Sequence, residues 1–110
     1  MINLKQLNDL GAFVSEELVP REIKFKLEED GEEVTAQIMV RRLSIGHYEA
    51  MWADVKEDTS KTARMLAESV RLGEGGTEKM TYEQAYQLHA KIALAMSEAV
   101  AAVNGGERKN

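Results

Sequence analysis

The sequence predicts an α+β fold in which an antiparallel β-hairpin packs against about three α-helices. Residues 23–27 and 34–40 have apolar side chains at every second position, which is the pattern of half-buried strands. The turn-forming pair Asp30-Gly31 lies between these two runs. Three later stretches have apolar side chains at helical spacing, and the last is long and rich in alanine. We expect the hairpin at residues 22–42 and helices at 45–57, 60–72 and 82–104.

The predicted hairpin has one apolar face. If Asp30 and Gly31 form its turn, three pairs of apolar side chains lie opposite each other on that face: Leu27 with Val34, Phe25 with Ala36 and Ile23 with Ile38. An exposed apolar face of this size needs a cover. The helix that follows Ser44 is expected to supply it, because Ser44 is a good N-cap and apolar side chains then recur at helical spacing.

The first 21 residues form an N-terminal region of their own. A short helix is predicted there, because Asn3 and Gln6 form a capping pair, Leu4, Leu7 and Leu10 lie three apart, and Gly11 ends the pattern. Residues 13–20 are interpreted as an irregular lead-in, since Pro20 has no N–H to donate to a strand ladder. Its apolar side chains either lie against the body of the protein or belong to an arm that reaches a neighbouring subunit.

The remainder of the chain is expected to be a single α+β domain, residues 22–104, followed by a disordered polar tail, residues 105–110. Residues 45–72 form either two helices, with Ser60 as a second N-cap, or one kinked helix. Residues 73–77 are interpreted as a flexible glycine loop, which lacks the lysine of a phosphate-binding loop. The last helix begins at a Thr81–Gln84 capping box and ends at Asn104-Gly105.

Composition limits the partners of this protein. At 110 residues the chain has room for one domain, and it contains no cysteine, which suits a reducing cytoplasm. No signal peptide and no apolar span of about 20 residues is evident, so we expect no membrane partner. The net charge is −5 and the fold contains a single basic doublet, Arg41-Arg42, so we expect no nucleic-acid partner.

The acidic side chains gather at the predicted hairpin tip. They are Glu28, Glu29, Asp30, Glu32 and Glu33. This group is either a solvated turn or a docking patch for a basic surface.

No set of residues in the sequence suggests catalysis. His47 and His89 lack a partner at metal-ligand spacing, the serines lie in no nucleophile motif, and no carboxylate is framed by apolar residues that would raise its pKa. We expect no enzymatic activity, no catalytic residue, no metal site and no cofactor.

The candidate interaction surface is apolar and lies on two helices. Tyr48 and Trp52 are among the few aromatic residues of the chain, and Trp52 either fills the core beneath the hairpin or lies at an interface. The last helix repeats its apolar side chains in steps of three and four, which fits either a core helix or a seam between subunits. The candidate surface comprises Tyr48, Met51, Trp52, Ile92, Met96, Ala99 and Val103.

Four segments, in their order and spacing, resemble the tail assembly chaperones of long, non-contractile-tailed phages and their prophages. They are Gly11–Ser15, Val19–Ile23, Val40–Ser44 and the closing Ala99–Gly105. The resemblance implies a non-catalytic protein that oligomerises and coats the tape measure protein during tail assembly, in the host bacterial cytoplasm and not in the mature virion. It also implies a longer frameshifted form that engages the major tail protein. A tail structural or connector protein, or a small regulatory dimer, are the alternatives.

Overall fold

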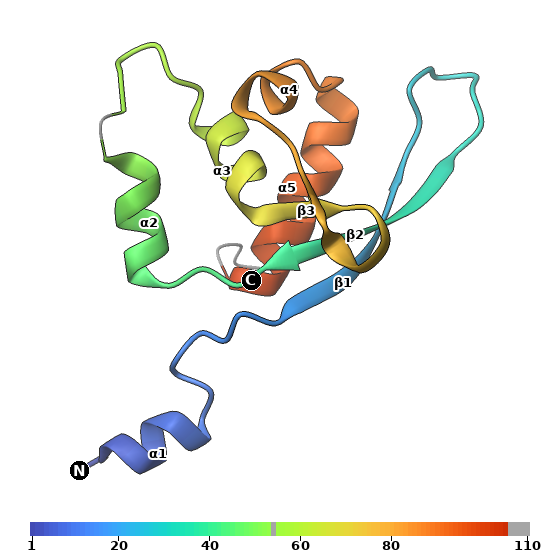
Figure 1. Cartoon of the computed structure of the whole chain (residues 1–110). Coiled ribbons are helices and arrows are strands. Elements are labelled where there is room, and N and C mark those ends of the chain that lie inside the picture. Colours follow the sequence, from blue (N-terminus) through green and yellow to red (C-terminus); the bar gives the residue numbers. More distant parts are fainter. Residues whose placement is uncertain (54, 106–110) are drawn as a thin grey trace.

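The computed structural model describes residues 1–53 and 55–105, and it has an α+β fold. Four antiparallel strands form one sheet in the order β1-β2-β3-β4 (Figure 1). The strands are β1 (Leu18–Phe25), β2 (Val34–Arg41), β3 (Val70–Leu72) and β4 (Glu78–Lys79). The helices are α1 (Leu4–Asp9), α2 (Ile45–Trp52), α3 (Lys61–Ser69), α4 (Tyr82–Tyr86) and α5 (Ala90–Asn104). The predicted fold class is therefore confirmed, including the short N-terminal helix and the long C-terminal one.

The core lies between the sheet and the two central helices. Helix α5 packs against β1 and β2, while α3 packs against α4, α5 and β2. Leu66 of α3, Val40 of β2 and Val70 of β3 are almost completely buried at the centre of this layer. Their burial removes the largest share of apolar area from water, so this contact between sheet and helices is the main source of stability.

The expectation that the helix after Ser44 covers the hairpin is wrong. Helix α2 packs beside α3, and its aromatic side chains, Tyr48 and Trp52, lie outside the core cluster. Helices α3 and α5 take the place on the sheet. The eight residues of α2 extend roughly 12 Å, whereas the 15 residues of α5 extend roughly 22 Å and so match the strands of eight residues beneath them.

The hairpin register differs by two residues from the predicted one. Phe25 pairs with Val34 and Ile23 pairs with Ala36, where the sequence predicted Ala36 and Ile38 as partners. A shift of two leaves every side chain on its original face, because the strand repeat is two residues. Ile23 accordingly remains buried on the apolar face as predicted.

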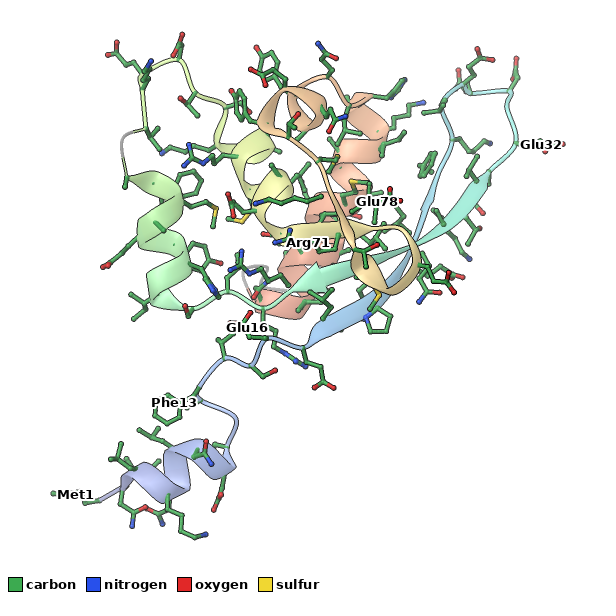
Figure 2. The ribbon with its side chains drawn as sticks, in the orientation of Figure 1. Met1, Phe13, Glu16, Glu32, Arg71 and Glu78 are labelled. Atoms are coloured by element: carbon green, nitrogen blue, oxygen red, sulfur yellow. The ribbon has the colours of Figure 1, made fainter. Side chains whose placement is uncertain are left out.

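The turn at the hairpin tip accounts for this shift. The Gly31 N–H donates to the Glu28 carbonyl at 2.9 Å, so Glu29 and Asp30 are the central residues of the turn. Asp30-Gly31 therefore occupies the third and fourth turn positions, where glycine is also favoured, and not the two central ones. The acidic tip extends away from the helices, with Glu32 at its outer side (Figure 2).

Several element boundaries correct the predictions. The hairpin expected at 22–42 begins at Leu18, so Pro20 is part of β1 and not of an irregular lead-in. A proline is tolerated there because β1 is an edge strand. The helix expected at 45–57 ends at Trp52, and the next begins at Lys61. Two separate helices are therefore present, as expected, and the alternative of one kinked helix is wrong.

Two further boundaries follow from tertiary contacts. The helix expected at 60–72 ends at Ser69, because residues 70–72 join the sheet as β3 and bury Val70 completely. The helix expected at 82–104 is broken into α4 and α5, and the His89 side chain caps α5 by accepting a hydrogen bond from the Lys91 N–H. The predicted glycine loop at residues 73–77 contains a 3₁₀ turn, Glu74–Gly76, which links β3 to β4.

Residues 1–17 stand off from the rest of the protein, and we call them the arm. Helix α1 has the predicted capping box between Asn3 and Gln6, yet none of its residues is buried. The radius of gyration is 15.6 Å, compared with about 13 Å for a compact chain of this length, and the extents are 56 × 34 × 32 Å. Figure 1 shows that the arm and the hairpin tip account for this elongation. Within the predicted polar tail, residues 106–110 lie outside the described residues.

Candidate interaction surface

An apolar groove lies between α2, α3 and α5. Its volume is about 290 Å³, which is near the lower end of the range of roughly 300 to 1,000 Å³ for binding pockets. The side chains that give it an apolar character come from all three helices: Tyr48, Trp52, Met65, Val100 and Ala101. The groove is open to solvent and has room for two or three apolar side chains of a partner.

The local sequence fixes the position of the two aromatic rings. Ser44 caps α2 as predicted: its hydroxyl accepts from the His47 N–H at 3.2 Å, and the His47 ring nitrogen accepts from the Ser44 N–H at 3.0 Å. Because Tyr48 and Trp52 are four residues apart on the capped helix, both rings lie on one face. That face lines the groove. Sequence reasoning missed the capping role of His47, since Glu or Gln usually fills this position.

Asn104 joins the end of α5 to the segment that leads into α2. Its side-chain oxygen accepts from the Leu43 N–H at 2.8 Å, and its amide nitrogen donates to the carbonyls of Arg41 and Val100, each at 3.2 Å. These bonds hold two walls of the groove together, because Asn104 itself lines it. The sequence identified Asn104 only as a helix stop signal, and no pattern in the sequence indicated its distant partners.

A charged cluster lies beside α3, around Glu68. Its carboxylate is 3.5 Å from the Arg41 guanidinium and 3.7 Å from the Lys79 ammonium, and its carbonyl accepts from the Arg71 guanidinium at 2.9 Å. Burial lowers the pKa of Arg71, and the nearby positive charge of Arg41 lowers it further. Figure 2 shows Arg71 within the body of the protein. Glu68 therefore balances three cations and supports the sheet edge.

The seven residues of the predicted surface do not lie on one continuous surface. Tyr48 and Trp52 line the groove, whereas Met51, Met96 and Ala99 are buried, with exposed fractions of 3%, 6% and 8%. Ile92 and Val103 are partly buried and pack against the core. The predicted seam along the last helix is also interrupted, because α5 begins only at Ala90. Contact between these seven residues and a partner stays a prediction. Of the seven, Tyr48 and Trp52 are the two that line the open groove.

The arm is a second exposed apolar surface. Leu4 and Leu10 of this segment have exposed fractions of 73% and 74%, and Ile2 and Phe13 have 52% and 58%. In Figure 2, Met1 and Phe13 lie clear of the body of the protein. Contiguous exposed apolar side chains are uncommon on monomeric proteins and usually mark a binding surface.

The described residues contain neither a metal-binding cluster nor a helix that could cross a membrane. Among residues 1–53 and 55–105, no group of three or more His, Cys, Asp or Glu residues is placed to hold a metal ion. Within the same described ranges, no helix is both long enough and apolar enough to cross a membrane.

A small domain with an exposed apolar groove and an exposed apolar arm has the features of a protein that binds other polypeptides. The family model described as "Phage tail assembly chaperone, TAC" matches residues 5–104. This match covers every strand and every helix of the structure except Leu4, the first residue of α1. The chain therefore belongs to the phage tail assembly chaperone family, and the resemblance seen in the sequence is confirmed. Searches of curated proteins and of solved structures found no match.

Proposed function

We propose that this protein self-associates and coats the tape measure protein during tail assembly by binding its apolar helical segments. Membership of the tail assembly chaperone family supports the role in tail assembly. The groove between α2, α3 and α5 is the single observation that supports this mode of binding, because it presents apolar side chains from three helices in a site open to solvent.

The groove has the form that accepts one face of an amphipathic helix. In this mode of recognition, a few apolar side chains of the bound helix enter a hydrophobic groove while its polar face remains in water. The aromatic rings of Tyr48 and Trp52 provide contact area, and Met65 adapts to side chains of different shapes. Such a groove binds many related segments with modest affinity and does not select one sequence.

Modest affinity at each groove is compatible with stable coating of a long partner. When several copies are joined, each further binding event becomes intramolecular, and the overall affinity rises by about two to four orders of magnitude. The proposal therefore requires self-association of the chaperone. It places the complex in the host bacterial cytoplasm and not in the mature virion, and it assigns contact with the major tail protein to a longer frameshifted form.

The test is co-expression with the tape measure protein of the same phage. We expect the wild-type chain to keep the tape measure protein soluble and Trp52→Ala to reduce the soluble fraction severalfold, since this change removes a wall of the groove. Ile45→Ala is the matched control, because Ile45 lies on the same helix, is 78% exposed and does not line the groove. Circular dichroism and a melting curve establish that both variants remain folded.

Two outcomes contradict the proposal. If the tape measure protein precipitates equally with and without the chain, and the chain is found in purified tails, the protein is a tail structural or connector protein. If the chain forms a discrete dimer without affinity for any tape measure segment, it is a small regulatory dimer.

A further inference from the structure

We propose that helix α1 of one copy binds in the groove between α2, α3 and α5 of a second copy. The inference rests on the proposed self-association and names the two surfaces that produce it. Both surfaces belong to this chain, both are apolar, and within the described residues neither is covered by its own subunit.

The arm has the properties of a segment that is stabilised by a partner. Helix α1 contains six residues, and isolated helices shorter than about 12 residues are marginal in water. Its ends are nevertheless well specified: Asn3 and Gln6 form a capping box, and the Ala12 N–H donates to the Leu7 carbonyl beyond the last turn. The sequence thus defines a helix that carries Leu4, Leu7 and Leu10 on one stripe without burying them in its own subunit.

The groove fits this stripe in size and in chemistry. A volume of about 290 Å³ has room for two or three leucine side chains. It is too small to enclose a whole helix, so the backbone of the bound helix remains outside the groove. Its apolar lining suits leucine, and the exposed Lys61 provides a polar group beside it. The family match begins at Lys5, so the arm belongs to the region that defines the family.

The arm can reach the groove of its own copy, but no arm residue lines that groove. The arm joins the body at Leu18, which pairs with Arg41, and the Arg41 carbonyl accepts from Asn104 at the edge of the groove. Residues 11–17 extend at most about 25 Å, so the groove of the same chain lies close to the root of the arm. The arm nevertheless points away from α2 in Figure 1, with its apolar stripe unpartnered.

When each copy gives its arm to one neighbour and accepts an arm from another, the contact is heterologous. It therefore adds copies in one direction and forms a ring or an open chain, as coating a long partner requires. An apolar client helix takes a groove by displacing the arm in it, while the copy that binds the client stays joined to its neighbour through its own arm.

The first test uses disulfide cross-linking between two variants, which is specific because the chain contains no cysteine. Leu7→Cys places a thiol on the arm and Thr62→Cys places one at the groove. When the two purified variants are mixed and oxidised, we expect a mixed disulfide about tenfold above that of a control mixture. In the control, Glu32→Cys at the hairpin tip replaces Thr62→Cys.

The second test measures assembly by analytical ultracentrifugation. We expect wild-type chain to form species larger than a monomer, and Leu10→Glu to sediment as a monomer with an unchanged melting temperature, because Leu10 is 74% exposed. The arm-in-groove contact is wrong if Leu10→Glu leaves the oligomer unchanged and the mixed disulfide shows no excess over the control. Self-association would then use another surface. A wild-type monomer at high micromolar concentration overturns both.

The chain carrying both Leu7→Cys and Thr62→Cys separates exchange from folding back. If it closes a disulfide within a monomer while the two single variants do not cross-link, the arm binds its own groove and the inference is wrong.

Discussion

The arm and the body of this protein use the same residue types with opposite results. Leu66 and Ile23 in the body have exposed fractions of 1% and 4%, whereas Leu4 and Leu10 in the arm have 73% and 74%. The local signals are equally strong in both regions, because α1 has the same kind of capping box as α2 and α4. The comparison teaches that caps and helical spacing specify a helix, but not the surface against which it packs.

The largest expected difference between the two regions concerns leucine truncation. Leu66→Ala removes a side chain at the centre of the core and should lower the free energy of unfolding by about 3 kcal/mol, and the melting temperature by about 10 °C. Leu10→Ala in the arm should change the free energy of unfolding by less than about 0.5 kcal/mol. Urea denaturation of the monomer measures both. Similar losses for the two variants would mean that the arm packs on its own body.

Glycine substitutions separate backbone strain from crowding. Gly76 and Gly11 have similar positive φ angles, +73° and +80°, but an added Cβ at Gly76 would lie 2.6 Å from the Leu18 side chain, while that at Gly11 meets nothing within 4 Å. Gly76→Ala should therefore lower the free energy of unfolding by about 2 kcal/mol. Gly11→Ala strains the backbone of the arm alone, so it should leave the global free energy of unfolding nearly unchanged. Gly75→Ala, in the same turn but without close neighbours, should cost about 1 kcal/mol.

Thermal denaturation of these three glycine variants checks the order. If Gly11→Ala is as damaging as Gly76→Ala, the arm contributes to the global stability of the fold.

Asparagine caps provide the third comparison. Asn104→Ala breaks two hydrogen bonds that join α5 to the chain before α2 and a third within α5, so we expect a loss of about 1 to 2 kcal/mol in the free energy of unfolding. Asn3→Ala removes the cap of α1 and should raise hydrogen exchange in residues 4–10 without changing global stability. Hydrogen exchange by mass spectrometry reports both effects, and a global loss in Asn3→Ala would contradict the separation of the two regions.

The smallest expected difference concerns ion pairs. Glu68→Gln removes the carboxylate that Arg41 and Lys79 share and should lower the free energy of unfolding by about 0.5 to 1 kcal/mol, less at high salt. Asp9→Asn breaks the exposed Lys5–Asp9 pair of α1, and we expect no measurable change. Denaturation at low and high salt tests this pair of variants, and a salt-independent loss in Glu68→Gln would argue against an electrostatic cause.

The features that the sequence predicted correctly depend on neighbours along the chain. The capping residues Asn3, Ser44, Ser60 and Thr81 all begin helices, and Asn104-Gly105 ends the last one. Each signal involves residues within four positions of each other, which a single sequence displays directly. The order of such segments also supported the resemblance to tail assembly chaperones.

The features that were predicted wrongly depend on distant contacts. Residues 70–72 continue a helical pattern, but pairing with β2 and complete burial of Val70 make them a strand. The hairpin register is set by the pairing of β1 with β2 and by the turn at Glu28–Gly31. The Asp30-Gly31 pair alone did not determine it. The groove was missed for the same reason, because its walls are three helices whose mutual positions no local pattern records.

Pro20 bears on how this protein avoids forming fibres through the edge of its sheet. The outer edge of β1 is unpaired over eight residues, and such an edge is a template on which strands of other copies add without limit. A proline in the middle of this edge removes one donor from any new ladder, and the charged residues Arg21, Glu22 and Lys24 repel close stacking of further strands. Growth of fibres through backbone pairing is thereby suppressed.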